Sequence, residues 1–174
     1  MDHSLTIISG GQTGVDRAAL DAALAAGLSC GGWCPLGREA EDGPIAPRYT
    51  LREAASPDPA RRTLLNVRDS DATLIIAHGP LSGGTELTAR HAKLLSRPYL
   101  VIDLAGTEDE IAHAARIKDW LGEQGVRKLN VAGPRESGVP GIYDAAQALL
   151  GPLFLALAAQ PPAADTVGRK PIEF

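Results

Sequence analysis

The chain has 174 residues, of which 44% are hydrophobic and 22% charged, and its formal net charge is −4. This length and composition suit one soluble globular domain with a core of its own. The acidic balance argues against a broad basic surface for nucleic acid. No stretch approaches the ~20 apolar residues of a membrane-spanning helix. The N-terminal MDHSLTIISGG lacks the basic segment and long apolar run of a signal peptide. We therefore expect a cytoplasmic protein with no nucleic-acid or membrane partner.

The first distinctive stretch joins an apolar strand to a glycine-rich turn and a helix. Residues 5–8 predict the strand, Gly10, Gly11 and Gly14 follow it, and residues 15–28 predict a helix rich in Ala and Leu. The free N–H groups of such a turn and the dipole of the helix favour a bound anion. The spacing G-G-x-x-G matches neither the dinucleotide fingerprint nor the P-loop. A tight turn without a ligand therefore stays an alternative.

The same turn carries polar side chains that could assist binding. Gln12 and Thr13 add side-chain donors, and Asp16 and Arg17 lie in the first helical turn. Asp16 is expected either to cap the helix or to reach a ligand hydroxyl.

The next segment, residues 28–34, predicts a short strand with Cys30 and Cys34 on one face. We expect both cysteines to be free thiols, because two cysteines in a protein of this kind rarely form a disulfide. We expect no metal site, because no second cysteine pair exists and the histidines are scattered, at His3, His78, His91 and His113.

A long connection of residues 35–59 follows, at a place where a pocket is expected. It is interpreted either as a functional loop or as a solvated lid with ordinary surface charges. Its polar candidates are Arg38, Glu39, Glu41, Asp42, Arg48 and Tyr49. Asp58 and Pro59 then predict the start of a helix over residues 60–69.

A second strand-turn-helix unit begins at residues 72–77, whose continuous apolar run predicts a strand buried on both faces. The following turn offers hydroxyls and bare backbone at Ser82, Gly83, Gly84 and Thr85. If this strand and the first strand are neighbours in the sheet, both turns face one crevice. Glu86 is interpreted either as a ligand contact or as a charge that favours the helix start.

The remainder of the chain continues the alternation of strands and helices. Strands are predicted over residues 99–104 and 128–133, and helices from 107 to 124, closed by Gly125, and from 142 to 159. The turn that begins at Gly133 would direct Arg135 into the crevice, where it could neutralise an anion. The sequence thus predicts one Rossmann-like α/β domain over residues 1–158. It has a parallel sheet of about five strands with helices on both faces, and a Pro-rich tail over 159–174.

Five segments together resemble a known family, the molybdenum-cofactor carrier proteins. They are GGQTGVDRAALDAAL at 10–24, GGWCPLGREAEDG at 31–43, NVRDSDATLII at 66–76, SGGTELT at 82–88 and LNVAGPRESGVPGIY at 129–143. The resemblance implies a Rossmann-like fold, a homo-oligomer, and a pocket for a pterin that carries a phosphate and a dithiolene-bound molybdenum. It places the phosphate between residues 10–14 and residues 82–85, and closes the pocket with Arg135, Glu136 and Ser137.

The same superfamily includes lysine-decarboxylase-like nucleotide phosphoribohydrolases, which carry P-G-G-x-G-T-x-x-E. This chain has S-G-G-T-E, and the position three after Thr85 is Thr88 rather than Glu. The difference argues against that chemistry, because a general acid must lie within hydrogen-bond reach of the reacting atom.

Three functions therefore stay open. The first is a non-catalytic binder of a phosphate-bearing small molecule, with the molybdenum cofactor as its cargo and no catalytic residue. The second is a nucleotide N-glycosidase that uses Asp16, Glu86 or Glu136 as its acid. The third is a module that senses nucleotides and signals through partners.

Overall fold

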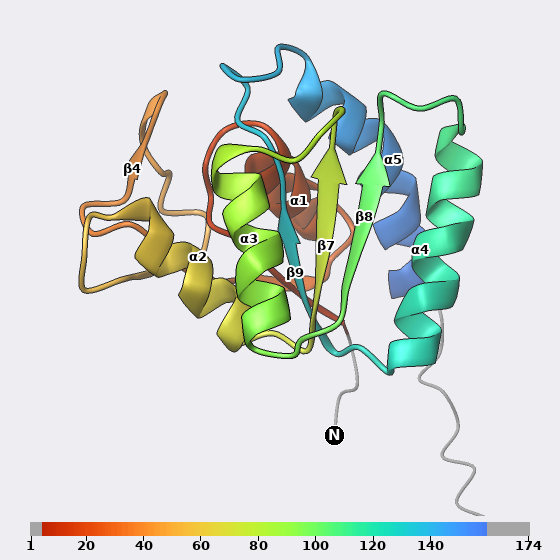
Figure 1. Ribbon diagram of the computed structural model, residues 1–174, viewed down its shortest axis with the longest axis horizontal. Coiled ribbons are helices and arrows are strands. Elements are labelled where there is room, and N and C mark those ends of the chain that lie inside the picture. Colours follow the sequence, from red (N-terminus) through yellow and green to blue (C-terminus); the bar gives the residue numbers. More distant parts are fainter. Residues whose placement is uncertain (1–4, 160–174) are drawn as a thin grey trace, which may run out of the picture.

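The strand β7 (Ala72–Ala77), with all six residues buried, is the most enclosed element of the central sheet. The computed structural model describes residues 5–159, and within them five parallel strands form a sheet in the order β2-β1-β9-β7-β8 (Figure 1). The other four strands of this sheet are β1 (Thr6–Ile8), β2 (Ser29–Gly31), β8 (Tyr99–Asp103) and β9 (Lys128–Ala132). This arrangement confirms the predicted α/β class.

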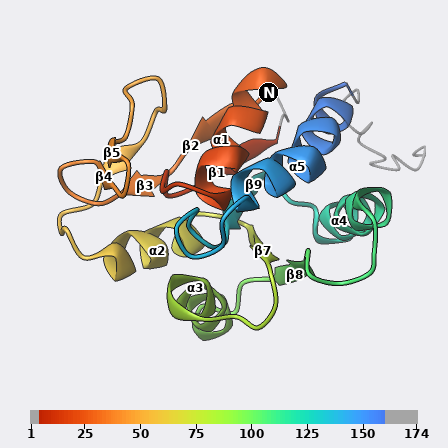
Figure 2. The same ribbon diagram turned by 90° about the horizontal axis from the view of Figure 1, so that it is seen from above.

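Helices cover both faces of the sheet, as Figure 2 shows from above. One face carries α1 (Val15–Ala25), α4 (Glu110–Gln124) and α5 (Ile142–Ala158), and the other carries α2 (Pro59–Arg68) and α3 (Gly83–Leu94). The main core lies under the first group, where small residues of α1 such as Ala18 and Ala22 pack with Leu149 and Phe154 of α5. Alanines let two helices approach closely, which explains the Ala-rich composition of α1.

Several predicted helix ends are confirmed. The side chain of Asp58 accepts a hydrogen bond from the N–H of Ala60, and Pro59 is the first residue of α2. Gly125 ends α4 in the left-handed conformation, with φ of 59°. The helix predicted over residues 15–28 ends earlier, at Ala25, and Gly27 follows it with φ of 71°, a left-handed conformation that glycine adopts readily after a helix.

The strand predicted over residues 28–34 is wrong as one element. It divides at Gly32 into β2 and β3 (Trp33–Cys34), and β3 leaves the main sheet to pair with β6 (Arg52–Glu53). Gly32 has φ of 134°, and a Cβ there would lie 2.1 Å from the carbonyl oxygen of Ser9. The backbone therefore turns at a position that only glycine can occupy, and the two cysteines, both free, do not share one strand face.

The connection after β3 is folded rather than irregular. It contains β6 and a small antiparallel hairpin of β4 (Glu39–Ala40) and β5 (Gly43–Pro44). A second apolar cluster lies beneath it, with Tyr49 and Ile45 almost fully buried.

The position of β9 also differs from the simplest expectation. It lies between β1 and β7, so the first strand and the strand at 72–77 are not neighbours. Among the described residues, none of the helices is both long and apolar enough to cross a membrane. The Pro-rich tail lies, from residue 160 onward, outside the described residues.

Candidate functional site

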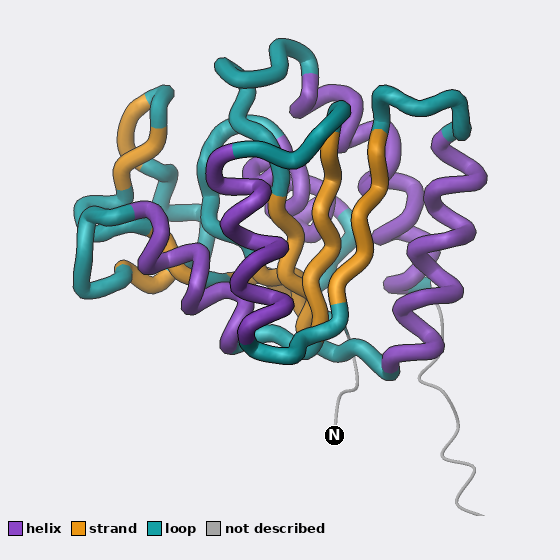
Figure 3. The backbone as a smooth tube through the Cα atoms, viewed as in Figure 1, coloured by secondary structure: helices purple, strands orange, loops and turns teal. Residues whose placement is uncertain are grey.

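A cleft of about 610 Å³, lined by both polar and apolar groups, opens at the carboxyl ends of the central strands. Its walls come from the turns after β1, β7 and β9 and from the first turns of α2 and α3. In Figure 3 the loops after β7 and β9 lie together at the upper end of the sheet. The crevice that the sequence predicted is therefore formed by three strand ends, with β9 in the middle.

The N-terminus of α3 forms one wall of the cleft. Ser82 precedes this helix in an extended conformation and makes no side-chain capping bond, and its carbonyl accepts the N–H groups of Thr85 and Glu86. The N–H groups of Gly83 and Gly84 have no acceptor within residues 5–159, and both glycines are exposed. Two backbone donors and the positive end of a helix dipole thus face the cleft.

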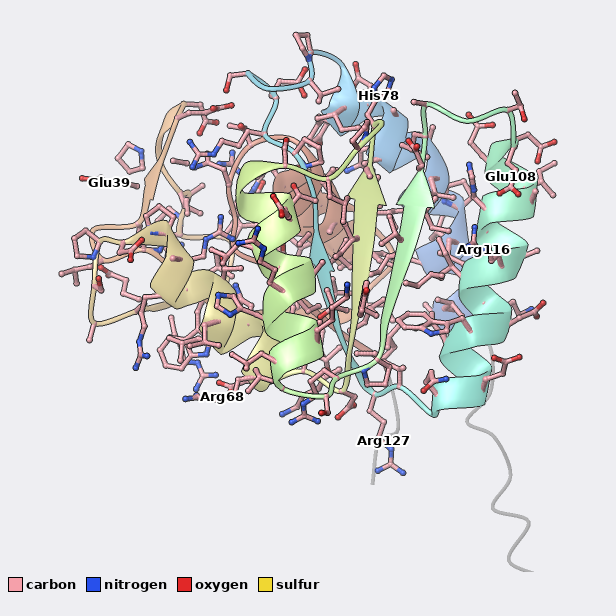
Figure 4. All side chains as sticks on the ribbon, viewed as in Figure 1. Glu39, Arg68, His78, Glu108, Arg116 and Arg127 are labelled. Carbon is pink, nitrogen blue, oxygen red and sulfur yellow. The ribbon has the colours of Figure 1, made fainter. Side chains whose placement is uncertain are left out.

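The turn that leads into α3 is held by a carboxylate of β8. The N–H of Gly79 donates to Asp103 Oδ1 over 2.7 Å, and this bond lowers the pKa of Asp103. His78 precedes Gly79 and lies at the upper end of β7 in Figure 4.

A buried ion pair forms the floor between α1 and α2. Arg62 Nη1 lies 2.9 Å from Asp16 Oδ2, and the two side chains are 13% and 5% exposed. Burial raises the pKa of Asp16, whereas the charge and hydrogen bond of Arg62 lower it. Gly10 makes room for this pair, because a Cβ there would lie 1.6 Å from Arg62 Nη1.

The glycines of the first turn fit neighbouring protein atoms closely. A Cβ on Gly11 would lie 2.6 Å from Leu51 Cδ1, and one on Gly14 would lie 2.4 Å from the carbonyl oxygen of Pro134. The N–H of Val15 donates to the same carbonyl. These glycines are therefore required for packing between the first turn, the connection 35–59 and the turn after β9.

The turn after β9 carries a cation on the rim of the cleft. Arg135 is exposed, and its guanidinium makes no hydrogen bond or ion pair within residues 5–159. The neighbouring Glu136 is used elsewhere: its carboxylate accepts the N–H groups of Gly141 and Tyr143 at the start of α5.

Nine of the predicted binding residues line the cleft. They are Gln12, Asp16, Ser82, Gly83, Gly84, Thr85, Gly133, Arg135 and Ser137. The other eight lie outside its lining: Gly10, Gly11, Thr13, Gly14, Arg17, Arg38, Glu86 and Glu136.

The side chains in this second group have structural partners. Arg17 binds the carbonyl of Gly11 and the carboxylate of Asp42. Arg38 donates to backbone carbonyls between residues 45 and 51, and Glu86 pairs with Arg90 on α3. A ligand-binding role for these three residues stays a prediction, because none of them lines the cleft.

Sequence reasoning missed the contribution of α2. Pro59, Arg62 and Thr63 line the cleft from one face of this helix, at spacings of three and four residues. The i, i+3, i+4 pattern is visible in the sequence, but nothing in it indicates that this face lies opposite α1. In the part of the chain that the structure describes, no three His, Cys, Asp or Glu side chains gather to hold a metal ion.

The fold and the cleft define a Rossmann-like α/β domain with a candidate binding cleft at the carboxyl ends of its central strands. Residues 7–154 match the circularly permuted YpsA SLOG family, and the chain belongs to that family. The chain is also similar to a crystal structure named a putative molybdenum carrier protein, from Syntrophus aciditrophicus SB. The TM-score is 0.84 at 45% identity, over 88% of this chain and 96% of that one. No curated protein matches the chain. The predicted family resemblance is thereby confirmed.

Proposed function

We propose that the chain binds a phosphate-bearing small molecule in the cleft and acts as a carrier, with the molybdenum cofactor as its cargo. The observation that carries this proposal is that hydrogen-bond donors face the cleft from two sides. The N–H groups of Gly83 and Gly84 lie at the start of α3, and the guanidinium of Arg135, on the facing turn, makes no hydrogen bond or ion pair with residues 5–159. Backbone N–H groups at a helix start and an unpaired arginine are both suited to a phosphate.

The size and chemistry of the cleft fit such a cargo. Its volume of about 610 Å³ lies within the range of small-molecule sites. The hydroxyls of Ser82, Thr85 and Ser137 add neutral donors and acceptors for the polar edge of a pterin. Molybdenum bound by a dithiolene arrives with its own sulfur ligands, so the protein need not supply a metal-ligating cluster. The name of the similar crystal structure supports the same role.

Native mass spectrometry of protein purified without oxygen tests the cargo directly. We expect a bound mass that corresponds to a pterin phosphate, with or without molybdenum. Protein that is empty, and that does not take up the cofactor when this is added, would contradict the carrier proposal.

The phosphate contact is tested with Arg135→Ala and a nucleoside monophosphate as the probe. Loss of a charge-assisted hydrogen bond should weaken binding by about 1.5–3 kcal/mol in isothermal titration calorimetry. Arg127→Ala is the matched control, because Arg127 lies at the opposite end of the sheet and points away from it (Figure 4). If the two variants bind the nucleoside monophosphate with equal affinity, Arg135 does not contact the ligand.

A second function is favoured by the single observation that Asp16 lines the cleft with a pKa raised by burial. A protonated carboxyl could serve as the acid of a nucleotide N-glycosidase. Release of free base from a nucleoside monophosphate, abolished in Asp16→Asn, would establish this activity. Glu86 and Glu136, the other predicted acids, are bound to Arg90 and to the start of α5.

A further inference from the structure

The turn of the β4–β5 hairpin places a carboxylate against the first and third turns of the site. Glu41 Oε1 accepts hydrogen bonds from Thr13 Oγ1 and from the N–H of Ser137, the latter over 3.1 Å. Glu41 Oε2 accepts a hydrogen bond from Ser137 Oγ over 2.5 Å. Three donors from two turns far apart in sequence thus converge on one carboxylate.

These donors are arranged as they would be for an external anion. Two hydroxyls and one backbone N–H bind both oxygens of a carboxylate, the pattern by which proteins hold carboxylate or phosphate oxygens. The hydrogen bonds from Ser137 and Thr13 lower the pKa of Glu41, so its charged form is the one that the donors stabilise. The charge of Arg135 acts in the same direction.

The other acidic residues of the hairpin have different surroundings. Asp42 pairs with Arg17 over 3.1 Å, which anchors the hairpin to α1. Glu39 points outward from β4, away from the centre of the molecule, in Figure 4. Only the carboxylate of Glu41 therefore reaches the donors of the site.

The place that Glu41 occupies borders the cleft. Ser137 and Gln12 both line the cleft, and Gln12 Oε1 accepts the N–H of Glu41 over 2.9 Å. The hairpin is therefore fastened to the rim through both its main chain and its side chain. An anion that entered from the cleft and reached Ser137 would meet the carboxylate of Glu41 already bound there.

We propose that Glu41 is a built-in competitor that occupies an anion subsite formed by Thr13 and Ser137, and that the β4–β5 hairpin is a latch which a ligand must open. The inference rests on the proposed function, because it concerns the same cleft, and the ligand group it concerns is a phosphate or a carboxylate. When the ligand anion takes the three donors, the Glu41 side chain moves into solvent. Release of the ligand lets the carboxylate return.

The latch has a measurable consequence for affinity. A ligand that binds only the open form has an apparent affinity reduced by the open fraction. Several hydrogen bonds to a charged group would keep the latch closed for most of the time, so its removal should strengthen phosphate binding about tenfold.

The test compares Glu41→Ala with Glu39→Ala, which removes the same charge from the same hairpin. Inorganic phosphate and a nucleoside monophosphate are the probes, and calorimetry gives the affinities of the full chain and both variants. We expect Glu41→Ala to bind both probes about tenfold more tightly than the unmodified chain, and Glu39→Ala to match the unmodified chain. Hydrogen exchange should also show a less protected Ser137 amide in ligand-free Glu41→Ala alone.

The possible failures are distinguishable. Equal or weaker binding by Glu41→Ala, with the nucleotide still bound by the unmodified chain, would overturn the latch and leave the proposed function intact. If Glu39→Ala increases the affinity for phosphate by the same factor, the change in net charge explains the effect. That result would also overturn the latch. Failure of all three proteins to bind either probe would overturn both proposals.

Discussion

Replacement of Arg62 by Met should destabilise the protein strongly, because it leaves the carboxylate of Asp16 without its cation. The side chain of Asp16 is 5% exposed, and Arg62 Nη1 lies 2.9 Å from it. Removing one partner of a buried ion pair typically costs about 3–5 kcal/mol. Methionine retains most of the apolar stem of arginine, so loss of packing contributes little.

We therefore expect Arg62→Met to lower the free energy of unfolding by about 3 kcal/mol near neutral pH. For a domain of this size such a loss corresponds to a decrease in Tm of roughly 6–12 °C. Urea denaturation followed by circular dichroism measures the free energy, and a thermal scan measures Tm. Arg61→Met is the matched control, because Arg61 is the preceding residue of α2 and is exposed to solvent.

The pH dependence makes the prediction sharper. Burial raises the pKa of Asp16 above its value in the unfolded chain, so the folded protein binds this proton more tightly. The corresponding stability is fully present below the unfolded pKa and is lost as the pH rises through the folded pKa. In Arg62→Met the lowering contribution of Arg62 is absent and the pKa of Asp16 rises further. The variant should therefore lose more stability at about pH 8 than at about pH 5.

Two results would refute this reasoning. A cost for Arg62→Met no larger than that for Arg61→Met would mean that the pair contributes nothing to stability. A loss of stability that does not depend on pH would mean that Asp16 is not the group left uncompensated. Addition of Asp16→Asn to Arg62→Met should restore part of the stability, because the buried charge is then gone.

Three further substitutions test the fold. Gly14→Ala should cost about 3 kcal/mol or more, because φ is 74° and the new Cβ would lie 2.4 Å from the carbonyl oxygen of Pro134. Gly141→Ala, with φ of 86° but no atom within 4 Å of the new Cβ, should cost only about 1–2 kcal/mol, and equal losses in urea denaturation would contradict the packing role of Gly14. Asp109→Ala should cost about 1 kcal/mol, because Asp109 Oδ1 accepts the N–H of Ala112 at the start of α4. An unchanged urea midpoint would show that this cap contributes nothing.

Sequence patterns correctly predicted those strands and helix ends that depend only on neighbouring residues. The apolar run at 72–77 indicated a strand buried on both faces, and β7 has all six residues buried. Asp58 followed by Pro59, and Gly125 after the helix predicted from 107 to 124, marked helix ends that the structure contains. Periodicity and capping depend on residues within one or two helical turns, so one segment is enough to recognise them.

The prediction of one strand over 28–34 was wrong because the break at Gly32 depends on a residue far away in the sequence. The backbone turns at Gly32 with φ of 134° and passes close to Ser9, which follows β1. Any side chain at position 32 would collide with the carbonyl oxygen of Ser9. The collision is a tertiary contact, and the sequence records it only as one glycine among nineteen.

In the cleft, too, some residues could be predicted from the sequence and others only from the tertiary structure. The sequence by itself determined that three glycine-rich or polar turns follow parallel strands, and parallel strands bring their carboxyl ends to one edge of a sheet. That reasoning found Ser82, Gly83, Gly84 and Arg135, which line the cleft. The tertiary structure alone decided that Arg62 faces Asp16 and that Glu41 reaches Thr13 and Ser137. These pairs are separated by at least 28 residues, and their proximity follows from how helices and the hairpin pack over the sheet rather than from any local preference.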